Sequence, residues 1–369
     1  MPSSAIRATT PLLVATLLLA TAGPRARQGP PPPPQQQQQQ QQQPVFRGRL
    51  ETVAVPVTVV DADGTLVTSL TRDDFMVFDN GRRQEITTFS AGLHPIRAVA
   101  LVDVSASMVP AIDDALMAAE QFIIRLRPGD SAKAGLFSQR ILLNPEFTGD
   151  RDELLTSLRQ TIPFSNPTKL FDAIDSAVTD VQTGSGRRVV VVFTDGCDTA
   201  SDTTWPALLN RIYASDVMVY AMMFRPRLIV KPPPSRSLSM GSAAAARPRS
   251  SQAPMGPCTL HHHLELSPAV RPADFLRVDD PRWTRGAQLV NALTADTGGR
   301  ALPISAAEDV NTLFTSLMKE LHYLYLLGFT PQALDGKVHE LNVRVNDRSL
   351  VVRARRNYLA PLTPPASRK

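Results

Sequence analysis

The chain has 369 residues, 43% of them hydrophobic, which is enough for one large domain and one smaller domain with separate cores. The formal net charge of +5 arises from 39 basic and 34 acidic residues. The stretch from Arg225 to Arg249 is basic and contains no acid, so the basicity is local. It is too mild, and too poor in interleaved aromatic residues, to indicate a nucleic-acid-binding protein.

The first 22 residues are typical of a signal peptide. A basic residue precedes the apolar run PLLVATLLLA, and ATA at 20–22 fits a small-x-small cleavage site. The run is too short to span a bilayer, and no later segment approaches about 18 uninterrupted apolar residues. We therefore expect an exported protein without a transmembrane segment, located in the periplasm, on the cell surface or in the medium. The Pro/Gln-rich residues 23–46 are expected to form an extended linker.

Residues 47–94 have the pattern of a small β-module. Val53, Val55, Val57 and Val59 alternate with other residues, as in a strand that buries one face. Phe75 and Val77 alternate in the same way, and the Asn-Gly pair at 80–81 predicts a hairpin turn.

From 95 to 321 strands alternate with helices, which predicts an open, mostly parallel, Rossmann-like sheet with helices on both faces. The runs 189–193 and 217–224 are apolar throughout, as in strands covered on both sides. Residues 226–283 form a low-complexity insertion rich in Pro, Ser, Ala and Arg. The expected strands are 98–104, 132–137, 140–147, 187–195 and 217–224, and the expected helices are 110–126, 151–161, 169–182, 203–214, 284–296 and 306–321.

The pattern returns to β-strands over 322–358, at 323–331, 338–346 and 349–356, and a short tail follows at 359–369. The simplest architecture is a β-sandwich-like module built from N- and C-terminal strands, with the α/β domain inserted between them.

Two carboxylates stand where apolar strands end, Asp103 after VALV and Asp195 after VVVFT. Ligands of open α/β sheets bind beyond the carboxyl ends of the strands. Ser105 and Ser107 follow Asp103 at alternate positions, so the candidate ligands are all oxygens. Such a hard set suits Mg²⁺, Mn²⁺ or Ca²⁺ and does not suit zinc or copper.

The segment DVSAS, from Asp103 to Ser107, resembles the Asp-x-Ser-x-Ser of the von Willebrand factor type A (VWFA) domain. In that family a loop threonine and a later strand-end aspartate complete a metal ion-dependent adhesion site, and Thr168 and Asp195 match them here. Segments 53–81 and 324–337 further resemble the flanks of bacterial VWFA-related domain proteins. The resemblance extends over about 47–358, the insertion excepted.

The resemblance implies a role for each matched residue. Ser105 and Ser107 would coordinate the ion directly, Thr168 directly or through water, and Asp103 and Asp195 mostly through waters. The ion, most favourably Mg²⁺, would keep an open position for an Asp or Glu carboxylate of a protein partner, which is adhesion chemistry without catalysis. The sequence departs from the family pattern at Ala106, where glycine is common, and at Asn166-Pro167, which replaces a glycine-rich approach to Thr168.

Three alternatives stay open. The serines could simply cap a helix. A phosphatase-like hydrolase would also place an aspartate after its first strand, but its general acid would be at position 105, which is serine. A structural or self-assembly role would fill the site from a neighbouring copy or from the insertion; the candidate carboxylates there are Glu265, Asp274, Asp279 and Asp280.

Other residues near these motifs have simpler interpretations. Asp198 is expected to face solvent or to cap the helix at 203, and Cys197 to be a small buried residue. A disulfide between Cys197 and Cys258 stays open. The adjacent histidines His261–His263 lack the spacing of a preformed metal site.

Overall fold

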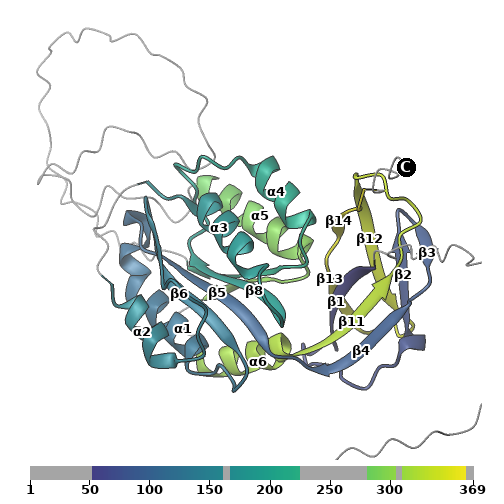
Figure 1. Ribbon diagram of the computed structural model, residues 1–369. Coiled ribbons are helices and arrows are strands. Elements are labelled where there is room, and N and C mark those ends of the chain that lie inside the picture. Colours follow the sequence, from purple (N-terminus) through teal and green to yellow (C-terminus); the bar gives the residue numbers. More distant parts are fainter. Residues whose placement is uncertain (1–51, 161–166, 225–280, 305–309, 363–369) are drawn as a thin grey trace, which may run out of the picture. The chain divides into compact units, whose positions relative to one another are not determined.

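The computed structural model (Figure 1) describes residues 52–160, 167–224, 281–304 and 310–362. All of them belong to the unit Leu50–Lys369. The signal peptide, the linker, the insertion up to residue 280 and the tail beyond 362 lie outside the described residues. Their limits, and the other domain boundaries, stay predictions.

The middle of the chain forms a six-stranded sheet in the order β10-β9-β8-β5-β6-β7. Every neighbouring pair is parallel except β6 with β7. This confirms the expected open, mostly parallel sheet. The strands are β5 (Ile96–Asp103), β6 (Ser131–Phe137), β7 (Ile141–Leu143), β8 (Arg187–Thr194), β9 (Met218–Phe224) and β10 (Ala301–Ile304).

Helices cover both faces of this sheet (Figure 1). In β5, Ala98, Ala100 and Val102 pack toward α1, α2 and α6, whereas Val99 and Leu101 pack toward α3, α4 and α5. The runs 189–193 and 217–224 are buried at every position, as their composition predicted. The helices are α1 (Ile112–Ile123), α2 (Arg151–Leu158), α3 (Leu170–Val181), α4 (Trp205–Tyr213), α5 (Pro281–Asp296) and α6 (Val310–His322), with a 3₁₀ turn η2 (Ala106–Ala111) before α1.

Strands from both ends of the described chain form two four-stranded sheets, β13-β1-β11-β4 and β14-β12-β2-β3. Apolar side chains of β1, β2, β11 and β12 share one core, which is the sandwich-like module that the sequence predicted. The strands are β1 (Val53–Val60), β2 (Phe75–Asp79), β3 (Arg82–Gln84), β4 (Thr88–Leu93), β11 (Tyr323–Phe329), β12 (Val338–Val345), β13 (Val351–Ala354) and β14 (Asn357–Leu359), with a 3₁₀ turn η1 (Arg72–Asp74) before β2.

The predicted Asn-Gly turn joins β2 to β3. Asn80 and Gly81 have φ angles of 46° and 77°, the left-handed conformation that a two-residue hairpin turn requires. In β1 the four valines are buried, but Thr58 and Val60 are buried as well. The second face of β1 is therefore covered as well as the face that carries the four valines.

Buried charged residues at the start of β8 and the end of α6 help to cover the second face of β1. Arg187 at the start of β8 donates to the carbonyl oxygens of Glu320 and Leu321 and lies 3.4 Å from the Thr58 hydroxyl. The Glu320 carboxylate accepts from Tyr220 and pairs with Arg353 at 2.8 Å. Polar contacts thus join the sandwich to the α/β part.

Two elements differ most from the expectation. The helix expected over 110–126 begins as the 3₁₀ turn η2, which contains Pro110, and its α-helical part ends at Ile123. The strand expected over 140–147 is the three-residue β7, because the Asn144 side chain accepts the N–H of Ala134 and Pro145 has no N–H to continue the ladder. In the described part of the chain, no helix is long and apolar enough to cross a membrane.

Candidate metal site

The strand pairing brings Asp103 beside the end of β8. Strands β5 and β8 are parallel neighbours with Val102 opposite Phe193, so Asp103 lies opposite the end of the strand that leads to Asp195. The Thr194 hydroxyl donates to Asp103 Oδ2 at 2.7 Å, and the Ser105 N–H donates to Oδ1 at 2.9 Å. Asp103 is fully buried, and both of its oxygens are held by neighbours at the carboxyl edge of the sheet.

Ser105 and Ser107 follow in the turn that leads into η2. Their hydroxyl oxygens are 3.1 Å apart, and Ser105 is buried. Ser105 occupies the N-cap position of η2, but its side chain makes no capping hydrogen bond. Helix capping therefore does not account for the Ser105 hydroxyl.

Asp195 follows β8 directly and is buried. Its Oδ1 accepts the Cys197 N–H at 2.9 Å, while Oδ2 is buried without any hydrogen-bond partner. The Ser107 hydroxyl lies close enough to lower the pKa of this carboxyl, although no hydrogen bond reaches Oδ2. An orphaned, buried carboxylate oxygen lacks a positive charge or a donor.

The pKa values of Asp103 and Asp195 also indicate that these two carboxylates lack a positive charge nearby. Burial, followed by the charge of Asp195, raises the pKa of Asp103 to about 7, and hydrogen bonds from Ser105 and Thr194 offset only part of this. Burial raises the pKa of Asp195 to about 6. Two buried carboxylates that repel one another are stabilised in their ionised form by a cation between them.

Thr168 reaches the same edge through the loop before α3. The next residue, Lys169, donates its N–H to the Ser138 carbonyl just after β6, while Thr168 itself is bonded to Thr199 after β8. Because β5 lies between β6 and β8, this loop crosses the end of β5. Thr168 is buried, and the structure thus brings all five predicted residues to one edge of the sheet.

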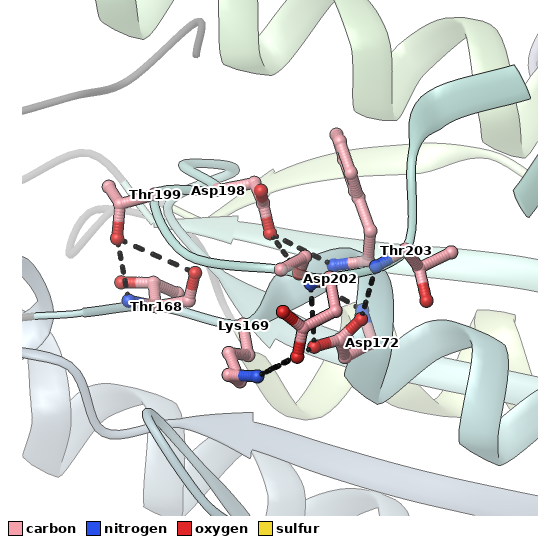
Figure 2. A network of polar contacts seen from close by, with 9 residues as sticks. Thr168, Lys169, Asp172, Asp198, Thr199, Asp202 and Thr203 are labelled. Carbon is pink, nitrogen blue, oxygen red and sulfur yellow. Dashed lines mark hydrogen bonds and ion pairs between the residues drawn. The ribbon is translucent and has the colours of Figure 1, made fainter. Parts of the chain in front are cut away.

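Figure 2 shows the network that joins this loop to the one after β8. Asp198 accepts the Phe171 N–H of α3 at 3.1 Å and also the Ser201 hydroxyl. Asp172 in turn accepts the N–H groups of Asp202 and Thr203, at 3.1 and 2.8 Å. An aspartate of each segment therefore accepts backbone N–H groups of the other segment.

The expectation for Asp198 was wrong. Its side chain is buried rather than solvent-facing, and it caps α3 rather than the helix after residue 203. Thr204 is the residue that caps α4, and its hydroxyl accepts the Ala207 N–H. The sequence favoured α4 because that helix begins nearby in the chain, whereas α3 comes close only in the folded structure.

Three polar residues that hold the candidate ligands or the loops beside them were not singled out from the sequence. Thr194 bonds Asp103, Thr199 bonds Thr168, and Asp172 bonds the loop after β8. Thr194 could have been identified from the sequence, since it immediately precedes Asp195 at the same strand end. Nothing local marks Thr199 or Asp172, because their partners lie about 30 residues away in the sequence.

The donor set fits a hard divalent cation. Two carboxylates and three hydroxyls supply oxygens only, and the carboxylates roughly neutralise a 2+ charge. Among the described residues, no group of three or more His, Cys, Asp or Glu could hold a metal, so a site here depends on hydroxyl ligands. Cys197 is buried as expected, whereas Cys258, His261–His263 and the four candidate carboxylates of the insertion lie outside the described residues.

Comparison with known proteins identifies the family of this part of the chain. Residues 98–197 match the von Willebrand factor type A domain family, and this segment includes all five candidate ligands. Residues 98–197 therefore form a von Willebrand factor type A domain, a kind of domain that suggests a protein-interaction or adhesion module. No curated protein matches the chain.

Among solved structures, similarity is found to an aerotolerance-related membrane protein from Bacteroides fragilis NCTC 9343, at 15% identity and a TM-score of 0.37, covering 61% of this chain and 98% of that one. BatB from Bacteroides thetaiotaomicron matches at 13% identity and a TM-score of 0.38, with the same coverage. The ArnB paralog VWA2 from Sulfolobus acidocaldarius matches at 14% identity and a TM-score of 0.35, covering 84% of this chain and 76% of that one.

Proposed function

We propose that the chain is an exported protein-binding module that holds a divalent cation through Asp103, Ser105, Ser107, Thr168 and Asp195. Mg²⁺ is the favoured ion, with Mn²⁺ and Ca²⁺ as alternatives. The cation presents an open position to an Asp or Glu carboxylate of a protein partner. No residue is assigned a catalytic role.

The orphaned Oδ2 of Asp195 is the observation that carries this proposal. It lies beside a second buried carboxylate whose pKa is raised, at the sheet edge where the Ser105 and Ser107 hydroxyls lie 3.1 Å apart. A cation relieves both the missing hydrogen bond and the repulsion. The serine and threonine ligands are neutral, so the bound ion stays electrophilic toward an incoming carboxylate.

Titration of the full chain with Mg²⁺ in a calorimeter tests the cation. We expect one ion per chain for the wild type and none for Asp195→Ala or for the double variant Ser105→Ala/Ser107→Ala. Asp113→Asn, which removes an exposed carboxylate from the first turn of α1, is the matched control and should bind like the wild type. Undiminished binding by Asp195→Ala would contradict the proposed ligand set.

Affinity capture in Mg²⁺ and in EDTA tests the partner. A protein captured by the wild type in Mg²⁺, and lost both in EDTA and with Ser105→Ala/Ser107→Ala, supports a bridging ion. A capture pattern that ignores the metal counts against it. Association of the chain with itself, dependent on Mg²⁺, would instead favour the self-assembly alternative.

A further inference from the structure

We propose that Thr199 is a positioning residue for the metal ligand Thr168, and that Thr168 and Asp195 form one preassembled half of the site before an ion binds. This inference rests on the proposed function. It concerns the hydrogen bonds that join residues 168–172 to residues 198–203, which we call the clasp (Figure 2).

The inner part of the clasp holds the backbone of Thr168. Its N–H donates to the Thr199 hydroxyl at 2.7 Å. Its carbonyl oxygen accepts the N–H groups of Thr199 and Ala200, at 2.9 and 3.1 Å. Both polar groups of the Thr168 backbone are thus bound to one short segment, and Thr168 cannot shift relative to that segment without breaking these bonds.

The outer part of the clasp fixes how α3 meets the same segment. As described above, Asp198 accepts a backbone N–H of α3, and Asp172 accepts two backbone N–H groups of the segment after β8. The Ser201 hydroxyl accepts the Asp172 N–H at 3.1 Å. The Lys169 ammonium pairs with both Asp172 and Asp202, at 3.1 and 2.6 Å. These bonds resist rotation of the loop about the inner contact.

The segment that holds Thr168 is itself tied to the other ligands. Only three residues separate Asp195 from Thr199, and two of them are fixed by short bonds: Cys197 N–H to Asp195 Oδ1, and Gly196 N–H to the Thr194 hydroxyl at 3.0 Å. That same hydroxyl donates to Asp103. Hydrogen bonds, together with the short backbone segment 195–199, therefore connect Thr168 to both carboxylates.

Partners that orient metal ligands affect affinity strongly, and their loss typically costs about 10- to 100-fold. Thr199→Val removes the hydroxyl acceptor while keeping the shape of the side chain and both backbone bonds to Thr168. We expect about tenfold weaker Mg²⁺ binding. Thr199→Ser restores the hydroxyl and should return the affinity to within about twofold of the wild type, by the same reasoning.

The experiment is Mg²⁺ calorimetry on the full chain, supported by thermal melts in EDTA that report folding. Thr179→Val is the matched control, because it removes a threonine hydroxyl of α3 that bonds only the Asp175 carbonyl; it should leave affinity unchanged. Thr199→Val is also measured in a Thr168→Ala background. If Thr199 acts through Thr168, Thr199→Val should not weaken Mg²⁺ binding any further in that background.

Equal losses in both backgrounds would overturn the inference, since Thr199 would then act by general loosening of the site. Affinity unchanged by Thr199→Val would overturn it as well, while leaving the proposed function intact. A wild type that binds no Mg²⁺ or Mn²⁺ overturns both. Should Thr199→Val fail to fold, Asp172→Asn, which cannot serve all the donors now on that carboxylate, takes its place with the same expectations.

Discussion

Replacing Asp103 by asparagine is expected to stabilise the ion-free protein at pH 8. In the folded chain the pKa of Asp103 is raised from 3.8 to about 7, chiefly by burial and then by Asp195. The unfolded chain releases this proton at lower pH than the folded chain does, so the free energy of unfolding falls as pH rises between about 4 and 7. Below that pH range the ionisation of Asp103 costs no stability, and above it the full cost applies.

The magnitude follows from the shift. A change from 3.8 to about 7 is about 3 units, and at about 1.36 kcal/mol per unit the buried charge costs about 4 kcal/mol. Asparagine removes this cost and keeps an acceptor for the Ser105 N–H. It presents an amide in place of a carboxylate oxygen to Thr194, which reduces the stabilisation by about 1 kcal/mol. In EDTA at pH 8 we expect Asp103→Asn to be more stable than the wild type by about 2–3 kcal/mol.

Urea denaturation in EDTA at pH 4.5 and pH 8 measures this difference, with Asp113→Asn as the exposed control. Most of the advantage of Asp103→Asn should vanish at pH 4.5. Mg²⁺ at 100 times its Kd should stabilise the wild type by about 2.7 kcal/mol and leave Asp103→Asn unchanged. The reasoning is refuted if Asp103→Asn is less stable than the wild type by the same margin at both pH values.

Three further substitutions test other parts of the fold by urea denaturation. Asp130→Asn should cost about 2 kcal/mol at pH 7, because Asp130 accepts from two backbone N–H groups and lies 2.8 Å from His322 Nε2. Burial opposes the lowering, but these bonds hold the pKa of Asp130 below its ordinary value, so the difference should shrink as pH falls through that pKa. Glu320→Gln should cost about 3 kcal/mol, since it leaves the partly buried Arg300 and Arg353 without their buried carboxylate. Gly135→Ala should destabilise by several kcal/mol or block folding, because its Cβ would lie 1.9 Å from a backbone carbonyl oxygen of β7.

Two of these substitutions have a matched control. Asp180→Asn removes a partly exposed ion pair with Lys133 and should cost less than about 1 kcal/mol; a similar cost for Asp130→Asn would contradict its role. Wild-type stability of Glu320→Gln would show that the arginines find other partners. Gly64→Ala has open space around its Cβ and φ of +77°, so it isolates backbone strain from the collision expected at Gly135.

The sequence predicted the sheet and the candidate ligands for a common physical reason. Strands buried on both faces are apolar throughout, and the carboxyl ends of parallel strands meet at one edge, so polar residues directly after such runs come together. This is why Asp103 and Asp195 could be related across 92 positions. Thr168 lies in a loop, so strand register does not fix its position, and it was matched through the family resemblance alone.

What could not be predicted lies in contacts between distant loops and between the two parts of the fold. Asp172 and Asp198 look like ordinary acids near helix starts, and their reciprocal bonds appear only once α3 and the loop after β8 are side by side. Arg187 and Glu320 look like surface charges, yet both are buried where the sandwich meets the α/β part. The early end of β7 is likewise set by an asparagine side chain and a proline, which local alternation does not reveal.

The connections of the α/β part have a mechanical consequence. Strand β4 leads directly into β5, α6 leads directly into β11, and the two crossing points are joined by the His94 N–H to the His322 carbonyl at 2.8 Å. Tension applied between residues 52 and 362 would therefore load the strands of the sandwich first, since β4 and β11 are paired along their length. The sheet edge that carries the candidate metal site would be shielded from that pull until this pairing gave way.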